Sequence, residues 1–247
     1  MDGGSGGGAV LSLLTTVPET GSTNADLLAA AASGAPEGRW QRAERQHAGR
    51  GRQGRHWLSA AGNCYASTLV RLRPADPPAA SLALVAAVAL DEVARAFLPH
   101  AGAALAIKWP NDLLLGGAKV AGILLERERE AVVIGFGVNL ASAPELADRP
   151  TTSLSAHGAG AEPQPFYEAL AEAFARWLGT WRGRGLDPVR MRWQERAHPP
   201  GTALVTTAGD GTPVSGLFDG LDRDGALILR EATGARRVIR AGDVFLA

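Results

Sequence analysis

The chain has 247 residues and a formal net charge of +0, because 25 basic side chains balance 25 acidic ones. This balance argues against a general nucleic-acid-binding protein, which usually carries a basic excess. Cys64 is the only cysteine, so no internal disulfide can form, which suits a reducing cytoplasm. The start lacks the charged and apolar regions of a signal peptide, so we expect a flexible tail over residues 1–9 and a cytoplasmic protein.

Residue patterns along the first 198 positions predict a mixture of strands and helices. Strand-like runs cover residues 10–17, 40–44, 64–72, 105–109, 113–115, 119–126 and 131–140. Helical patterns cover residues 25–32, 79–97, 166–182 and 188–197. Asp91, Glu92 and Arg95 interrupt the most apolar stretch, which therefore predicts a buried amphipathic helix and not a membrane span. Because strands and helices do not alternate regularly, we expect an α+β fold.

A change in character at Pro199-Pro200-Gly201 indicates a domain boundary. We therefore expect one domain over residues 10–198 and a second over residues 199–247. Short strand-like runs separated by turn residues follow the boundary, over residues 202–207, 213–221, 226–231, 236–240 and 244–246. About five short strands in so few residues predict a small SH3-like β-barrel.

The segment Arg45–Trp57 is glycine-rich and basic, with four arginines and three glycines between Arg45 and Arg55. Glycine lets the backbone approach a ligand closely, and arginine is a forked donor that matches phosphate oxygens. The segment is therefore a candidate phosphate clamp. A solvated basic loop or an RGG-like contact with RNA is the alternative that the segment alone leaves open.

Three other segments carry candidate binding groups. After Pro110, the residues Asn111 and Asp112 lie in a predicted turn where they could reach a metal, a ribose or local backbone, and Lys119 opens an apolar strand. A plain hairpin whose lysine reaches solvent is the alternative. Residues 22–24 are either a helix N-cap or donors to a polar headgroup. Glycines in residues 135–139 predict either the approach of a ligand or tight packing.

These segments, in this order and spacing, resemble those of biotin protein ligases. The matching motifs are GSTN (21–24), GRGRQGRHW (49–57), KWPNDLLL (108–115), KVAGILLE (119–126) and GFGVNL (135–140). The resemblance implies a class II synthetase-like domain, with a mixed or antiparallel sheet and flanking helices, followed by the SH3-like barrel. The motifs begin near residue 20, so we expect no N-terminal DNA-binding domain and no specific DNA binding.

The resemblance also implies a reaction in two steps and a role for each matching residue. Biotin and ATP, with Mg²⁺ as its counter-ion, would give biotinyl-5′-AMP, which a carrier lysine then attacks. The implied biotin-binding residues are Ser22, Thr23, Asn24, Gln46, Gly49, Arg50, Arg52, Arg55, Lys119 and Gly122. The implied nucleotide-binding residues are Arg50, Arg52, Arg55, Trp57, Asn111, Lys119 and Asn139. The implied catalytic residues are Lys119, Arg52 and Asp112, with no resident metal site.

The expected partner is the biotin carboxyl carrier domain of an acyl-CoA carboxylase, with no nucleic acid and no membrane partner. We expect a monomer or a weak homodimer, and a basic loop that is mobile without ligand, with Arg52 held by few contacts. A lipoate–protein ligase of similar fold is the nearest alternative. An RNA-binding module and an inactive ligase are more distant ones, since the net charge is zero and Lys119 and the loop arginines are intact.

Overall fold

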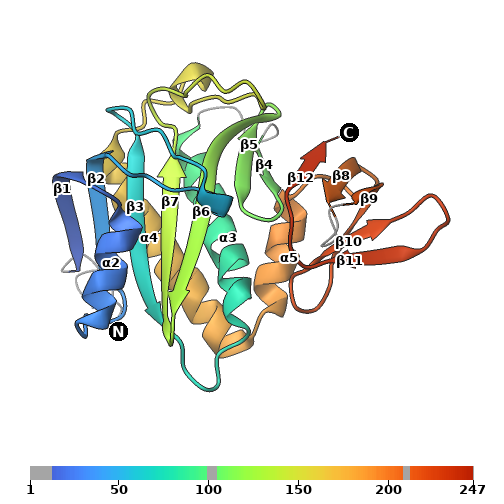
Figure 1. Ribbon diagram of the computed structural model, residues 1–247, viewed down its shortest axis with the longest axis horizontal. Helices are drawn as coiled ribbons and strands as arrows, with labels where there is room; N and C mark the ends of the chain where they lie inside the picture. Colours follow the sequence, from blue (N-terminus) through green and yellow to red (C-terminus); the bar gives the residue numbers. More distant parts are fainter. Residues whose placement is uncertain (1–12, 99–104, 208–211, 247) are drawn as a thin grey trace, which may run out of the picture.

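The structure is a computed structural model that describes residues 13–98, 105–207 and 212–246 (Figure 1). The tail expected over residues 1–9 lies outside the described residues. Two sheets dominate, one with seven strands and one with five. Both helices and strands contribute to the larger unit, so the predicted α+β class is confirmed.

The larger sheet has the strand order β1-β2-β3-β7-β6-β5-β4. Its strands are β1 (Leu14–Thr20), β2 (Trp40–Gln46), β3 (Cys64–Arg71), β4 (Leu105–Lys108), β5 (Asp112–Leu115), β6 (Ala118–Glu128) and β7 (Ala131–Val138). β1 and β2 run parallel, because helix α2 (Thr23–Ala32) lies in the crossover between them. The remaining neighbours are antiparallel, which makes the sheet mixed, as predicted.

Alternation along β7 separates the two faces of this sheet, since successive side chains in a strand point to opposite sides. Val132, Ile134 and Phe136 belong to the main core, which they share with helices α3 (Leu82–Phe97) and α4 (Pro163–Arg184). Val133 belongs instead to a small cluster with Leu27 of α2. In Figure 1, α2 lies on the opposite face of the sheet from α3 and α4. The glycines of β7 therefore face the α2 side.

The helices end close to their predicted limits. A short 3₁₀ turn at Ala79–Ser81 precedes α3, so the α-helix starts a turn later than the apolar pattern suggests. Helix α5 (Asp187–Arg196) follows α4 and leads to the second unit. Asp91 in α3 is buried and forms ion pairs with Arg95 and with Arg196 of α5, which compensates a charge inside the core.

The smaller sheet is antiparallel, with the order β11-β10-β9-β8-β12. Its strands are β8 (Ala203–Thr207), β9 (Pro213–Leu221), β10 (Leu227–Arg230), β11 (Arg236–Ile239) and β12 (Val244–Leu246). The five predicted C-terminal strands are confirmed. β11 and β12 lie at the two ends of the strand order, so the closure of this sheet into an SH3-like barrel stays a prediction.

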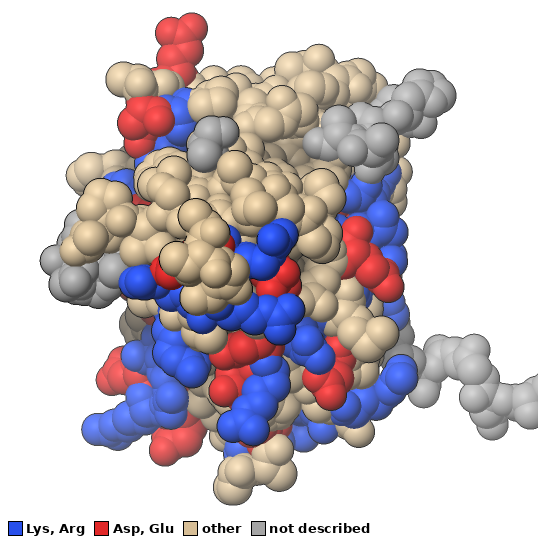
Figure 2. All heavy atoms as spheres, turned by 90° about the vertical axis from the view of Figure 1, so that its right-hand side faces the viewer, with Lys and Arg blue, Asp and Glu red and all other residues tan. Residues whose placement is uncertain are grey.

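The side of the molecule that carries the smaller sheet bears charges of both signs. Figure 2 shows basic and acidic side chains next to one another on this face, not a field of one sign. The arginines of β11 form ion pairs with acidic neighbours, Arg236 with Asp219 and Arg237 with Glu231. Interspersed charges of this kind neutralise one another locally, so the described side chains on this face do not form a continuous basic stripe.

Candidate functional site

A cleft of about 300 Å³ opens on the α2 face of the larger sheet. It is lined by the start of α2, the basic loop that follows β2, the strands β5, β6 and β7, a segment over residues 144–151, and Asp243 before β12. The predicted site residues that line it are Ser22, Thr23, Asn24, Gln46, Arg50, Arg52, Arg55, Trp57, Asn111, Asp112, Lys119, Gly122 and Asn139. All five motifs thus contribute residues to one cleft.

Gly49 is the one predicted site residue that does not line the cleft. A Cβ at this position would lie 2.6 Å from the backbone oxygen of Trp57 and 3.2 Å from Nε2 of Gln46. Its backbone oxygen accepts a hydrogen bond of 2.9 Å from the Trp57 amide. Gly49 is therefore needed for the close approach of the two ends of the loop, and its contact with biotin stays a prediction.

One end of the cleft is a neutral hydrogen-bonded cluster at the start of α2. Ser22 is the N-cap residue, and its hydroxyl accepts from the Ala25 amide at 3.5 Å. Oε1 of Gln46 accepts from the Thr23 amide at 2.9 Å, and the hydroxyls of Thr23 and Ser67 lie 2.6 Å apart. All these groups are buried or half-buried, so the cluster is rigid and offers donors and acceptors in fixed directions.

Asn24 continues this cluster towards β6. Its Oδ1 accepts from Oγ of Ser67 at 2.6 Å, and its Nδ2 donates to Oε2 of Glu126 at 2.8 Å. A Cβ on Gly135 would lie 2.3 Å from Oδ1 of Asn24. Glycine at position 135 is therefore required for this amide to lie flat against β7, which explains one glycine of the GFGVN segment.

The other two glycines of the cleft floor are cross-strand partners, since Gly122 of β6 pairs with Gly137 of β7. The indole of Trp57 lies on them: a Cβ on Gly137 would be 2.4 Å from Cε2, and one on Gly122 would be 3.0 Å from Cζ3. Nε1 of Trp57 is buried and has no hydrogen-bond partner among the described residues. These glycines thus leave room for the indole, which is the tight packing that the sequence offered as one alternative, and the approach of a ligand to them stays a prediction.

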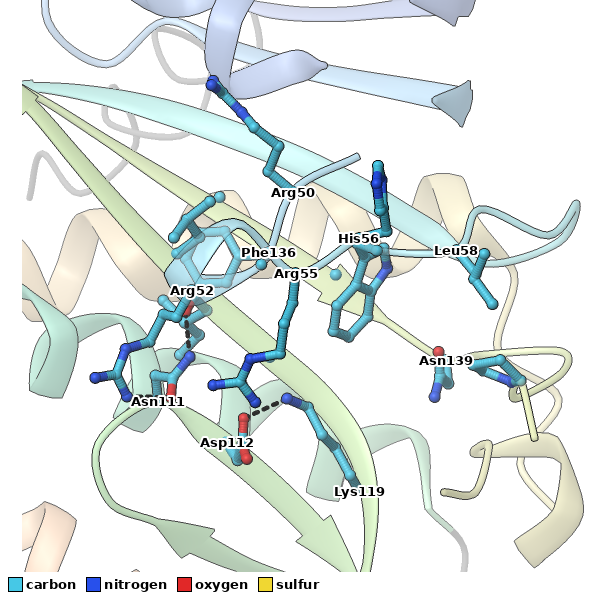
Figure 3. A pocket seen from close by; sticks show the side chains of 18 of the residues that line it. Arg50, Arg52, Arg55, His56, Leu58, Asn111, Asp112, Lys119, Phe136 and Asn139 are labelled. Atoms are coloured by element: carbon cyan, nitrogen blue, oxygen red, sulfur yellow. Dashed lines mark hydrogen bonds and ion pairs between the residues drawn. The ribbon is translucent and has the colours of Figure 1, made fainter. Parts of the chain in front are cut away.

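The opposite end of the cleft is a charged cluster. Nζ of Lys119 lies 2.5 Å from Oδ1 of Asp112, and Nζ of Lys108 lies 3.4 Å from Oδ2 (Figure 3 draws the Lys119 contact). Asp112 is only 7% exposed. Burial opposes its ionisation, but the two ammonium groups outweigh that effect and hold the pKa of Asp112 below its usual value. Two cations against one carboxylate leave this end with a surplus positive charge.

The basic loop is held by contacts at two places. Arg50 forms an ion pair of 3.1 Å with Glu126 on β6. Arg52 donates to Oδ1 of Asn111 at 3.3 Å and to the backbone oxygen of Gly242 at 3.2 Å, and Arg55 pairs with Asp243. Figure 3 shows Arg55 directed towards the Asp112–Lys119 pair and Arg52 directed towards Asn111, whereas Arg50 is directed away from both.

The expectation that few contacts would hold Arg52 is wrong. Arg52 also lies 3.4 Å from Oδ1 of Asp243, and the loop itself is closed by a hydrogen bond of 2.7 Å from the Gly51 amide to the backbone oxygen of Arg55. Acidic and polar partners compensate the repulsion between neighbouring arginines. Charge complementarity with the second sheet, which loop composition does not encode, is the physical reason for the difference.

Several lining residues were not predicted. They include His56, Leu58, Pro144, Leu146, Asp148, Arg149, Thr151 and Asp243. The segment over residues 150–152 pairs with the start of β6, through hydrogen bonds of 2.9 Å between Lys119 and its neighbours Pro150 and Thr152. The amide of Asn139 donates to Thr152 at 3.1 Å and fixes the same segment. The sequence of the segment over residues 144–151 has no helical or strand periodicity. Only its tertiary contacts therefore show that it lines the cleft.

None of the helices among the described residues is long and apolar enough to cross a membrane. Within the same residues, no three or more His, Cys, Asp or Glu side chains gather in a way that would hold a metal ion.

Two family models match this chain. Residues 17–139 match the biotin/lipoate A/B protein ligase family, and residues 205–247 match the biotin protein ligase C-terminal domain. A "biotin–[acetyl-CoA-carboxylase] ligase" of Paracoccus denitrificans is 45% identical over 240 residues, which cover 92% of this chain and 97% of the relative. A protein of the same name from Mycobacterium tuberculosis is 36% identical over 247 residues, covering 97% of this chain and 91% of the relative.

The fold agrees with that of a solved structure. The biotin protein ligase of Aquifex aeolicus, in complex with biotin and ATP, superimposes with a TM-score of 0.83 at 22% identity, over 95% of this chain and 99% of the other. Both the larger unit and the smaller sheet are therefore those of an already observed architecture.

Proposed function

This chain belongs to the biotin protein ligase family, and from that premise we propose that it attaches biotin to a lysine of a biotin carboxyl carrier domain at the expense of ATP. The acceptor would be the carrier domain of an acyl-CoA carboxylase, as the names of its relatives state for those proteins. One observation carries the proposal: a single cleft joins a neutral hydrogen-bonding pocket to a cluster with surplus positive charge.

The first step places an anion beside a polyanion. A carboxylate oxygen of biotin attacks the α-phosphorus of ATP, and the bond to the β-phosphate breaks, which gives biotinyl-5′-AMP and pyrophosphate. Because both reactants are negative, positioning and charge stabilisation supply most of the catalysis. Lys119 is our candidate for the group between carboxylate and α-phosphate. Arg55, which lies beside the Asp112–Lys119 pair, and Arg52, which lies beside Asn111, would neutralise the phosphates.

In the second step, the carrier lysine nitrogen attacks the acyl carbon of biotinyl-5′-AMP. The lysine ammonium first loses one proton to solvent, because only the neutral amine has a lone pair for the attack. The bond from the acyl carbon to the phosphate oxygen then breaks, AMP leaves, and the nitrogen loses a second proton to solvent. We assign Asp112 to contact this lysine, because an ionised carboxylate attracts an ammonium and can accept its hydrogen bond. The lowered pKa of Asp112 supports that assignment, since the group stays ionised at neutral pH.

The headgroup of biotin would bind at the start of α2. A ureido ring presents a carbonyl acceptor and two N–H donors, and Ser22, Thr23, Asn24 and Gln46 offer hydroxyls and amides that match both kinds of group. Gly122, on the cleft floor, leaves room for the ligand chain. Asn111 and Asn139 are assigned to the nucleotide, and Trp57 to a stacking contact close to adenine. Mg²⁺ would enter with the triphosphate as its counter-ion.

Three further properties belong to the same proposal. The single, buried Cys64 suits a reducing compartment, so we assign the protein to the cytoplasm. The ion-paired arginines of the smaller sheet favour a protein that does not bind nucleic acid. A monomer or weak homodimer stays our prediction for the assembly state.

The deciding experiment incubates the protein with Mg-ATP, a carrier domain and either biotin or lipoate. We expect avidin blotting to detect biotin on the carrier, and mass spectrometry to detect no lipoylation. Transfer of lipoate instead would favour the lipoate-ligase alternative. Pyrophosphate release with biotin but without transfer would show that the carrier was wrongly chosen. No reaction of either acid with ATP would refute the proposed function.

A further inference from the structure

Glu126 belongs to none of the groups assigned above, although it ends the KVAGILLE segment. Its carboxylate lies between two parts of the cleft that are far apart in sequence. Oε2 accepts from Nδ2 of Asn24 at 2.8 Å, and Oε1 lies 3.1 Å from Nη2 of Arg50. One side chain therefore touches both the start of α2 and the beginning of the basic loop.

We propose that Glu126 is a positioning residue, which fixes the direction of the hydrogen bonds in the headgroup pocket and ties that pocket to the basic loop. The inference rests on the proposed function and adds a residue to it. Glu126 is not itself a catalytic residue, because its contacts are with Asn24 and Arg50 and the effect reaches the ligand through them.

The direction follows from what a carboxylate can do. An ionised carboxylate only accepts hydrogen bonds, so the Asn24 amide must turn its NH₂ group towards Glu126. Its Oδ1 then faces Oγ of Ser67, which lies 2.6 Å away and has to donate. The Ser67 oxygen in turn accepts from the Thr23 hydroxyl, again 2.6 Å away. Each proton in this chain is therefore assigned by the carboxylate at its end.

The consequence appears at Thr23. The one hydroxyl proton of Thr23 serves Oγ of Ser67, at 2.6 Å, and Oε1 of Gln46, at 3.1 Å, so towards a ligand Thr23 has only lone pairs left and acts as an acceptor. A ureido N–H is a donor, so it matches this arrangement. Oε1 of Gln46 lies 3.1 Å from the same hydroxyl and keeps its hydrogen bond of 2.9 Å from the Thr23 amide. With a neutral amide at position 126, only the longer hydrogen bond of 3.4 Å to the Leu124 carbonyl would favour this direction of the Asn24 amide, so Asn24 could turn round and reverse the chain of donors.

The second contact of Glu126 is its ion pair with Arg50. Three loop arginines line the cleft, and in Figure 3 Arg50 is directed away from the charged end, whereas Arg52 is directed towards Asn111 and Arg55 towards Asp112. The partner of Arg50 is the same carboxylate that orients Asn24. Arg50 therefore anchors the start of the loop to β6, whereas the other two arginines remain directed to Asn111 and Asp112. The Glu126 carboxylate therefore fixes both the position of the basic loop, through Arg50, and the geometry of the headgroup pocket, through Asn24.

The test is a set of double-mutant cycles on the full chain, read by biotin affinity and by the rate at which preformed biotinyl-5′-AMP dissociates. Glu126→Gln keeps the size of the side chain but removes its charge. We expect it to weaken biotin binding about tenfold, as for one hydrogen bond to a charged group. The matched control is Glu128→Gln, two positions further along β6, where the side chain is exposed.

The cycle with Asn24→Ala separates positioning from a structural role. If Glu126 acts through Asn24, the effect of Glu126→Gln on biotin affinity should fall below about twofold when Asn24 is already alanine. If Asn24→Ala does not fold, Ser67→Ala interrupts the same chain one step further on. In the second cycle, Arg50→Met and Glu126→Gln should each speed adenylate release, and together do no more than either alone.

Additive effects in both cycles would overturn the proposal, because they would mean that Glu126 only stabilises β6. So would a Glu126→Gln variant whose biotin affinity and adenylate release match those of the wild type. A wild-type protein that forms no biotinyl-5′-AMP would instead refute the proposed function, whatever the variants do. The two failures are therefore distinguishable.

Discussion

The two ends of the cleft are built on different physical principles. At the α2 end, hydroxyls and amides are buried and satisfy one another at distances of 2.6 to 2.9 Å. At the other end, Lys108 and Lys119 share the single carboxylate of Asp112, and the charges are only partly compensated. Under the proposed function, the ligand headgroup would meet donors and acceptors in fixed directions, whereas phosphate would meet cations and replace their present partners.

This contrast predicts that substitutions at the charged end affect chemistry and retention of the intermediate, whereas those at the floor and the neutral end affect binding geometry. Four experiments test the difference, from the largest expected effect to the smallest.

Lys119→Ala should slow adenylate formation the most. Loss of an ammonium that neutralises developing charge should cost about 3 kcal/mol in the first step, by analogy with a lost oxyanion donor. The fold should survive, because Lys108 still compensates Asp112. Pyrophosphate release in single turnovers measures the effect, with Glu128→Gln as a control on the same strand. A rate within about threefold of the wild type would exclude this role for Lys119.

Arg52→Gly should retain adenylate formation but lose the intermediate faster. One lost charge-assisted contact corresponds to about 1.5–3 kcal/mol in the dissociation of biotinyl-5′-AMP. The leaked intermediate would then label lysines on bystander proteins. The matched control is Arg129→Gly. Arg129 is exposed and has a φ of 55°, which glycine adopts without steric strain. If the off-rate of preformed intermediate stays the same, Arg52 does not retain it.

Gly137→Ala should disturb the cleft floor without unfolding the protein. The new Cβ would lie 2.4 Å from Cε2 of Trp57, so the indole has to leave its place. Overpacking of this kind costs about 1–3 kcal/mol. We expect weaker biotin binding by calorimetry and a change in tryptophan fluorescence. Gly179→Ala, at an exposed helical position with open space around it, should change neither. Unchanged binding in Gly137→Ala would mean that Trp57 moves freely.

The smallest effect concerns stability in acid. Because the pKa of Asp112 is lowered in the folded state, its contribution to stability is present above the unfolded pKa of about 3.9 and is lost as the pH falls through the folded pKa. Urea unfolding should therefore show Asp112→Asn to be less stable than the wild type at pH 7, with a difference that shrinks below about pH 4. A difference that grows in acid would contradict the ion-pair assignment.

The sequence by itself determined most of the elements and the chemistry of the cleft. Glycine spacing, the arginines of the basic loop and the KWPND turn identified residues that do meet in one cleft, because each segment carries its own conformational and chemical signal. The five strands of the smaller sheet were equally predictable from their turn residues. Local signals of this kind need no knowledge of distant partners.

Only the tertiary structure decided which groups compensate one another. Asn24 and Glu126 are separated by 102 positions, and Arg52 and Asp243 by 191, yet each pair is in contact. A carboxylate at position 126 or 243 has no periodicity or motif that reveals its partner, since opposite charges attract wherever folding brings them. The first contact depends on the order of the larger sheet, in which β6 lies beside β7 and below α2. The second depends on the packing of the smaller sheet against the basic loop.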